Sequence, residues 1–348
     1  ILDLKDHLSR PLKLAAPLEG VGFEYGINTN YLRTLVKYWR DDYLPRWTDR
    51  QNYLNSFPQY KTKIQGLDIH FIHIKPQQKS KDILPLILLH GWPGSVREYY
   101  GLISELISGN HEKYDFELIV PSLPGFGWSQ ASSKKGLSPS AMAVIFKNLM
   151  KRLGHEKFLI QGGDFGAIIG SHLATLYPDS VIGVHSNMCG VNGPSSVFKW
   201  MFASVFPTWF VTSEQISFHF PISSYLSKVI EETGHLHIHS TKPDTIGTVF
   251  SRNPVGLLAY FVEKFATWTN PEFKKFEDGN LEKKFKLDDL FDNIMIYYLT
   301  NSITTSQRIY AESFAKTEMA LQLDNIPTRF LMDVLGSNMR CFIVWIGN

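Results

Sequence analysis

The chain has 348 residues, more than the roughly 250–300 at which a single hydrophobic core stops growing, so we expect a core domain with an inserted or appended layer. Its 35 basic and 33 acidic side chains give a net charge of +2, a balance that predicts no nucleic-acid partner. Two cysteines, Cys189 and Cys341, exclude a disulfide framework, and the longest uncharged apolar stretch, residues 200–213, is shorter than the roughly 18 residues that span a bilayer.

The first 60 residues are rich in aromatic side chains. They predict one clear helix, from Tyr31 to Arg40, because Leu32 and Trp39 lie on its apolar face and Asn28 or Asn30 precedes it as an N-cap. We interpret this apolar face as ordinary core packing.

Strands and helices alternate between residues 61 and 187. On the strand at residues 69–74, His70 and His73 face opposite sides, so we interpret both as structural. Further strands are predicted at residues 84–89, at 116–120, from residue 158 onwards and at 181–185. Helices are predicted in the segment that ends near residue 108, over residues 139–153 and over residues 165–177. This alternation predicts an α/β fold with a doubly wound, mostly parallel sheet.

A helical periodicity with many aromatic residues follows between residues 188 and 314. Inserted after a strand of the sheet, such a block predicts a lid over the catalytic edge. We expect most of its apolar side chains in the core of the lid and a minority along a substrate cavity. His235, His237 and His239 alternate, which we interpret as a polar strand, because no Cys or carboxylate stands at metal-ligand spacing.

The segment from Phe158 to Gly170 combines an apolar strand, a glycine-rich turn and the start of a helix. This is the order of a nucleophile elbow, in which a strained turn holds one side chain over the carboxyl edge of a sheet. The position of the nucleophile carries Asp164, which is ionised at neutral pH and can attack a saturated carbon. The product is an ester that water must hydrolyse. The simpler alternative is that Asp164 caps the helix that begins at Phe165.

The sequence His90-Gly91-Trp92-Pro93 ends a predicted strand. The backbone N–H groups of Trp92 and Phe165 could hold the oxyanion that forms when water attacks an Asp164 ester, and losing one such donor costs ~3 kcal/mol. A plain turn shaped by Pro93 is the alternative, but the elbow elsewhere in the chain favours the catalytic interpretation. Residues 125–127 lack the third glycine of a dinucleotide fingerprint, and we predict no cofactor.

Six stretches of the chain are similar to the microsomal epoxide hydrolase family of the α/β-hydrolase superfamily. Within that family the chain most resembles the insect juvenile hormone epoxide hydrolases. The stretches follow in family order between about residues 21 and 327: Tyr60 to His73, His90 to Ser95, Ala131 to Gly136, Gln161 to Gly166, Thr241 to Gly247 and Gln307 to Tyr310.

The resemblance implies the roles of the site residues. Asp164 is the nucleophile, and Trp92 and Phe165 supply the oxyanion N–H groups. Tyr310 is one of two lid tyrosines that hydrogen-bond the epoxide oxygen, and His235 stands where the family has the other, so it is a candidate second donor. The implied substrate is a small apolar epoxide, either juvenile hormone or a xenobiotic, with no metal and no cofactor.

The resemblance also implies an organisation and a location. We expect an N-terminal epoxide-hydrolase segment at residues 1–60, an α/β-hydrolase core at 61–187, a helical lid at 188–318 and the remnant of the C-terminal core with a divergent tail at 319–348. The implied location is the cytosolic face of the endoplasmic reticulum membrane. Because the chain begins with Ile1, we expect an N-terminal piece, with any membrane anchor, to lie outside it, and the chain itself has the composition of a soluble protein.

After Pro327 the sequence departs from the family. No histidine follows His239, and Asp333 has no histidine downstream, so we identify neither the acid nor the base that would activate water. The sequence therefore predicts ester formation, with turnover in doubt. We expect the apolar residues 341–346 to be exposed or loosely packed.

Two alternatives stay open at this stage. A haloalkane dehalogenase also uses an elbow aspartate, but it would need a halide-holding indole or amide pair in place of Tyr310. A catalytically inactive binder of juvenile hormone or a similar lipid fits the unmatched tail, although not the intact elbow and oxyanion turn.

Overall fold

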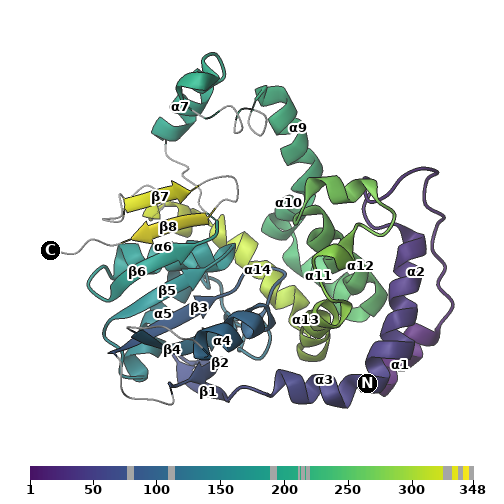
Figure 1. Cartoon of the computed structure of the whole chain (residues 1–348), viewed down its shortest axis with the longest axis horizontal. Helices are drawn as coiled ribbons and strands as arrows, with labels where there is room; N and C mark the ends of the chain where they lie inside the picture. The colour runs from purple at the N-terminus through teal and green to yellow at the C-terminus, as the bar shows by residue number, and fades with distance from the viewer. Residues whose placement is uncertain are drawn as a thin grey trace.

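The computed structural model of the chain describes residues 1–76, 82–108, 114–188, 194–210, 220–323, 331–335 and 340–344, with the single residues 212 and 216. Its described strands form one eight-stranded sheet with the order β1-β2-β4-β3-β5-β6-β8-β7. The sheet occupies the left of Figure 1, and a layer of helices stands to its right. The strands are β1 (Gln59–Ile64), β2 (Leu67–Ile74), β3 (Asp82–Leu89), β4 (Tyr114–Pro121), β5 (Phe158–Gly162), β6 (Val181–Ser186), β7 (Leu331–Leu335) and β8 (Arg340–Val344).

The four central strands, β4, β3, β5 and β6, are parallel. Ile87, Leu88 and Leu89 are fully buried at the end of β3, as expected for a strand covered on both faces. Antiparallel pairs extend the sheet on both sides, β1 and β2 beyond β4 and β8 and β7 beyond β6. The predicted α/β class is confirmed, and the sheet is mixed with a parallel centre.

Helices cover the parallel centre. α4 (Tyr100–Ile107) packs near β4, and α6 (Phe165–Leu176) packs against β5, β3 and β6 with α5 (Pro139–Arg152) beside it. The predicted α5 is confirmed, and Ser138 caps it by accepting a hydrogen bond from the Ala141 N–H.

The segment after β6 is helical, as its periodicity predicts. α10, α11 and α12 pack together with α13 and α14 beside the carboxyl edge of the parallel strands (Figure 1). The helices are α7 (Pro194–Ala203), α9 (Ile222–Glu232), α10 (Gly234–Thr241), α11 (Pro243–Arg252), α12 (Pro254–Thr267), α13 (Leu287–Thr300), α14 (Ile303–Ser313) and α15 (Lys316–Met319).

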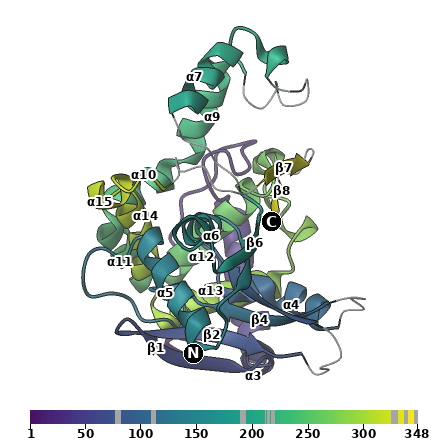
Figure 2. The same cartoon turned by 90° about the vertical axis from the view of Figure 1, so that its left-hand side faces the viewer.

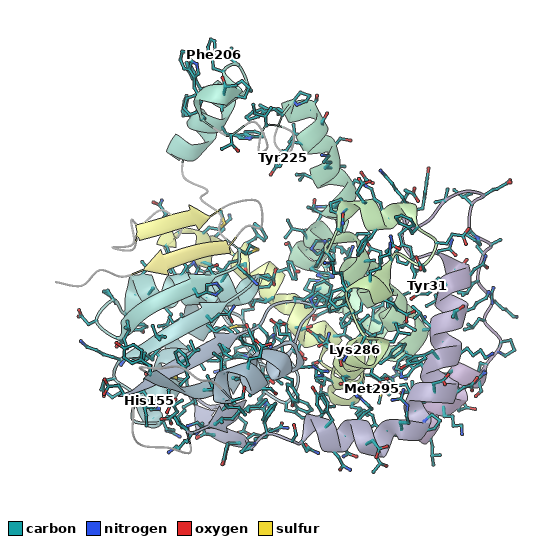
Figure 3. All side chains as sticks on the ribbon, in the orientation of Figure 1. Tyr31, His155, Phe206, Tyr225, Lys286 and Met295 are labelled. Atoms are coloured by element: carbon teal, nitrogen blue, oxygen red, sulfur yellow. The ribbon has the colours of Figure 1, made fainter. Side chains whose placement is uncertain are left out.

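One part of this helical segment contradicts the predicted lid core. α7 and α9 project away from the body in both views (Figures 1 and 2), and Phe206 lies at the end of the projection in Figure 3. The side chain of Trp209 is 72% exposed and that of Phe202 is 55% exposed. The expectation that these apolar residues are buried is wrong. Among the described residues, α7 contacts mainly the turn that follows it, through rings such as Phe202 and Phe206, and α9, through Trp200 and Tyr225.

The N-terminal segment contributes α1 (Leu2–Ser9), α2 (Thr29–Tyr38) and α3 (Trp47–Leu54). α2 begins two residues before its predicted start. Its cap is Asn28, whose side chain accepts hydrogen bonds from the N–H groups of Asn30 and Tyr31. No helix among the described residues is both long enough and apolar enough to cross a bilayer.

The C-terminal tail extends the sheet. The backbone of β8 pairs with β6, with Cys341 opposite Ser186, so residues 340–344 are held by a strand ladder. Their side chains, that of Asp333, and residues 345–348 lie outside what the structure describes. The expected exposure or loose packing of residues 341–346 therefore stays a prediction.

A buried carboxylate, Asp292 of α13, lies where the N-terminal segment meets the helical layer and is 0% exposed. Its oxygens accept hydrogen bonds from the Tyr43 hydroxyl at 2.8 Å, from Arg97 Nε at 2.8 Å and from the guanidinium of Arg50. A buried ionised group is stable only when it is paired and fully hydrogen-bonded, which these three donors achieve.

We predict that Asp292→Ala lowers the free energy of unfolding by about 3–5 kcal/mol, because it leaves two guanidinium groups without a buried partner. Urea unfolding followed by circular dichroism measures the change. The matched control is Asp244→Ala, which breaks an exposed pair with Arg308 and should cost about 0–1 kcal/mol. Equal losses in the two variants would show that the Asp292 cluster does not join the two parts.

Candidate active site

The turn between β5 and α6 has the geometry of a nucleophile elbow. Asp164 has φ +52° and ψ −125°, an arrangement that a residue other than glycine adopts only under strain. A Cβ on Gly166 would collide with the carbonyl of Leu89, so glycine is required where the helix crosses the end of β3. The Asp164 side chain makes no capping hydrogen bond to α6, so the helix-cap alternative is not supported.

The structure brings together the three predicted residues of the oxyanion site. The Trp92 N–H donates to Asp164 Oδ1 at 2.8 Å, and the Phe165 N–H lies close enough to this carboxylate to act against the rise in its pKa. The pairing follows from the sheet, because Leu89 of β3 and Gly162 of β5 are neighbours at the ends of adjacent parallel strands. The two N–H groups can hold the oxyanion of a tetrahedral intermediate on this carboxyl group.

The place of Asp164 on an elbow suggests a side chain that is exposed above the sheet. In the structure this side chain is half-buried and lines a cavity. Burial raises the pKa of Asp164 to about 6, while the N–H groups of Trp92 and Phe165 act in the opposite direction. At pH 7 the carboxylate is still mostly ionised, with about ten ionised molecules for each protonated one. The group therefore keeps, at neutral pH, the charge that attack on an epoxide would require, and it loses this charge at mildly acidic pH.

A cavity of about 590 Å³ opens above the elbow. Its wall combines Asp164 and Trp92 with Glu98 from the turn after β3, Asn187 from the end of β6, and Phe265 and Leu290 from α12 and α13. The lining also includes Arg97, Asp289 and Asn293, so apolar and polar side chains are combined, as is typical of a site for a small ligand.

Tyr310 of α14 contacts both oxyanion residues and is only 4% exposed. Its ring centroid lies 4.7 Å from that of Phe165 and 5.8 Å from that of Trp92. Burial, with the nearby charge of Asp164, raises the pKa of Tyr310 far above its ordinary value, so the phenol stays protonated. Its hydroxyl has no hydrogen-bond partner within the described part of the chain, and it is therefore free to donate to a ligand.

The three lid histidines are on a helix, α10, and not on a strand. The prediction of a polar strand is wrong. Histidines at every second position also place His235 and His239 four residues apart, which is the spacing of neighbours on one face of a helix. His235 stacks on Trp92 with ring centroids 6.0 Å apart and lies 5.8 Å from Tyr310, while His237 is exposed on the other face.

His239 is a site residue that the sequence analysis missed. Its ring lies 4.9 Å from that of Tyr310, and its Nε2 is hydrogen-bonded to the Tyr260 hydroxyl at 2.9 Å. Burial lowers the pKa of His239 to about 3 and that of His235 to about 4, so both are neutral at pH 7. If α10 is assigned as a helix from the sequence, the i, i+4 spacing places His239 on the same face as His235 and identifies it as a site residue.

The described residues offer one group of potential metal ligands, His73, Glu117 and His155, at the other end of the sheet. His155 is labelled there in Figure 3. His73 Nε2 and Glu117 Oε1 are 2.6 Å apart in a hydrogen bond, closer than the roughly 3.3 Å between two ligands of a tetrahedral zinc ion. His73 thus has a structural partner, while His70 is hydrogen-bonded to Ser122 and Gln59.

Two family profiles cover the first 211 residues of the chain. The epoxide hydrolase N terminus matches residues 1–99, and the alpha/beta hydrolase fold matches residues 85–211. Juvenile hormone epoxide hydrolase 1 of Ctenocephalides felis is 49% identical over 312 residues, which are 89% of this chain and 67% of that protein. This chain belongs to the epoxide hydrolase family.

Other epoxide hydrolases agree with this assignment. Epoxide hydrolase 1 of Oryctolagus cuniculus is 43% identical over 342 residues, 95% of this chain and 74% of that protein. The crystal structure of juvenile hormone epoxide hydrolase from the silkworm Bombyx mori is 46% identical and matches with a TM-score of 0.91 over 94% of this chain and 77% of that chain. The predicted α/β-hydrolase fold and the predicted family are confirmed.

We predict that Asp164→Asn raises the melting temperature at pH 8 and leaves it unchanged at pH 4. The pKa of Asp164 is higher in the folded chain than the ~3.9 of an unfolded chain, so stability falls as the pH rises from about 4 to about 6, and an amide avoids this loss. Differential scanning calorimetry at the two pH values measures the difference.

Asp244→Asn is the control for this experiment. The hydrogen bond from Arg308 lowers the pKa of Asp244. The control should therefore be less stable than the parent at pH 8, and this difference should shrink as the pH falls. A melting temperature of Asp164→Asn that is below that of the parent at pH 8 would contradict the buried charge at the elbow.

Proposed function

We propose that this protein opens apolar epoxides by attack of the Asp164 carboxylate on a ring carbon. The C–O bond of the ring breaks, an ester of Asp164 forms, and the former ring oxygen takes up a proton and becomes a hydroxyl group. The observation that carries the proposal is the hydrogen bond from the Trp92 N–H to Asp164 Oδ1, beside the Phe165 N–H. It joins a nucleophile that needs no activating base to an oxyanion site for hydrolysis of its ester.

In this proposal Tyr310 donates the proton to the opening ring. Its ring packs on Phe165, the charge of Asp164 is near enough to raise its pKa, and the high pKa keeps the proton available. His235 is a second donor through one ring N–H, since the neutral imidazole is a donor at one nitrogen. Donation to a developing alkoxide by a positioned group typically contributes about 10²–10⁴ in rate.

The names of the relatives support the substrate class. Several are juvenile hormone epoxide hydrolases, and the cavity wall includes the apolar side chains Phe265 and Leu290. We propose an apolar epoxide of the juvenile hormone or xenobiotic type, with residues 188–318 as the lid, residues 61–187 as the core and residues 1–60 as the family's N-terminal segment. Similarity to the microsomal family supports a location at the endoplasmic reticulum membrane.

We predict that Asp164→Ala abolishes covalent labelling by styrene oxide, an apolar aryl epoxide, because the attacking oxygen is removed. Intact-mass spectrometry detects the adduct, and peptide mapping should place it between Phe158 and Ile169. Circular dichroism checks folding, and Asp244→Asn should label like the parent. Full labelling of Asp164→Ala would disprove the assignment of the nucleophile, and binding without an adduct in the parent would favour an inactive lipid binder.

Tyr310→Phe should slow formation of the ester by roughly 10²–10⁴-fold, because the proton donor is lost while the ring packing is kept. Single-turnover labelling with styrene oxide gives the rate. Tyr298→Phe is the matched control, since that hydroxyl donates to Asp3 on the other side of α13. An unchanged rate in Tyr310→Phe, together with a slow rate in His235→Phe, would transfer the donor role to His235.

A further inference from the structure

Three side chains that can bind a metal ion meet near the amino ends of β4 and β5, whereas the elbow lies at the carboxyl ends of the parallel strands. His73 belongs to β2, Glu117 belongs to β4, and His155 precedes β5 (Figure 3). One ligand atom from each residue lies within 4.8 Å of the other two. The proposed opening of an epoxide uses none of the three, so the cluster can have a role of its own.

The strand ladder places the first two of these residues. β2 and β4 are antiparallel neighbours, and His73 pairs with Ile119. Glu117 is two positions from Ile119, so it is the diagonal neighbour of His73 on the same face of the sheet, within reach of a long side chain. The backbone pairing therefore brings an imidazole and a carboxylate together.

His155 is positioned by the turn that ends α5. The Gly154 N–H donates to the Lys151 carbonyl at 3.0 Å, and the His155 N–H donates to the Met150 carbonyl at 2.9 Å. Gly154 has φ +92°, the left-handed conformation that this type of helix end requires. The end of the helix thus fixes the backbone of His155 independently of its contact with Glu117.

Both imidazole rings approach the same carboxylate oxygen. His73 Nε2 is 2.6 Å from Glu117 Oε1, and His155 Nε2 is 3.2 Å from that oxygen. Two ligands of a tetrahedral zinc ion are roughly 3.3 Å apart, so the contact of His155 already has this length. The hydrogen bond of His73 must lengthen by about 0.7 Å when an ion takes the place of its proton. Rotation of the flexible Glu117 side chain can supply this movement.

One of the two ring nitrogens is buried without a matched partner. His155 Nε2 is shielded from solvent, and despite its short distance to Glu117 it forms no aligned hydrogen bond with any residue that the structure describes. A buried polar atom without a partner is unfavourable, and a bound ion is one of the few explanations for it. A metal ion in the cluster would use the lone pair of this nitrogen.

The burial and charge of the cluster also suit a cation. The side chains of His73 and Glu117 are each 11% exposed, and that of His155 is 14% exposed. The ligands are therefore largely desolvated, while a narrow exposed part allows an ion and a water ligand to enter. A carboxylate is ionised at neutral pH, so Glu117 offsets part of the charge of a divalent ion.

We propose that His73, Glu117 and His155 form a binding site for a divalent transition-metal ion of the Zn²⁺ type. The two Nε2 atoms and one carboxylate oxygen bind the ion, each neutral ring carries its proton on Nδ1, and water completes a tetrahedral set. Two imidazoles favour zinc over Mg²⁺ and Ca²⁺, which prefer oxygen ligands. The ion connects β2, β4 and the segment before β5, and so stabilises the amino end of the sheet without taking part in the chemistry at the elbow.

The test measures binding of Zn²⁺ and Co²⁺ to the full chain after treatment with a chelator. We expect one equivalent of Zn²⁺ to bind in calorimetry and to raise the melting temperature, and Co²⁺ to give the visible absorption of a tetrahedral ion. Glu117→Gln and His155→Gln should lose the Co²⁺ absorption. They should also weaken Zn²⁺ binding by at least the roughly 10–100-fold that follows loss of a partner outside the ligand set. His155→Cys should restore binding, because a thiolate is also a zinc ligand.

His237→Gln is the matched control, an exposed histidine of α10, and it should bind Zn²⁺ like the parent. Circular dichroism of the metal-free variants checks folding, and rescue by His155→Cys separates loss of a ligand from loss of structure. No binding of Zn²⁺ by the parent, or equal binding by the parent and Glu117→Gln, would overturn the proposal. Binding that is lost in His235→Gln but kept in His155→Gln would place the ion among the lid histidines, and would also overturn it.

Discussion

The site depends on the hydrogen bond between the Trp92 N–H and Asp164 Oδ1. It joins the carboxyl ends of β3 and β5, two parallel neighbours in the centre of the sheet. Because each strand ends in a turn at the same edge, a nucleophile from one and an N–H donor from the other meet without any long-range adjustment. The positive φ of Asp164 is the cost of directing the carboxylate at that donor, and the packed sheet and α6 maintain it.

The turn at Gly91–Gly94, which carries the Trp92 N–H, is also held from the side of the helical layer. Asn293 of α13 donates to the Pro93 carbonyl at 2.6 Å, and Tyr297 donates to the Gly94 carbonyl at 2.7 Å. The position of α13 depends in turn on Asp292 and its hydrogen bonds to the N-terminal segment and to Arg97. The N-terminal helices therefore act on the chemistry without contacting the cavity, since they hold the helix that holds the turn.

Burial sets the electrostatics of the cavity. It raises the pKa of Asp164 and lowers that of His235 and His239, so each group moves towards its neutral form. A low-dielectric site with several titratable groups holds few charges at once. At neutral pH the charge rests on Asp164, where the N–H groups of Trp92 and Phe165 favour the ionised form.

The sequence alone determined the local features. The apolar strand before Asp164, the glycines of the elbow and the turn after His90 predicted the nucleophile and its N–H donors, because these depend on residues that are adjacent in the chain. Two features required the tertiary structure. The histidines of α10 were assigned to a strand because alternation and helical spacing coincide over five residues. The side chains of α7 were expected to be buried because a sequence does not show which element will pack against a helix.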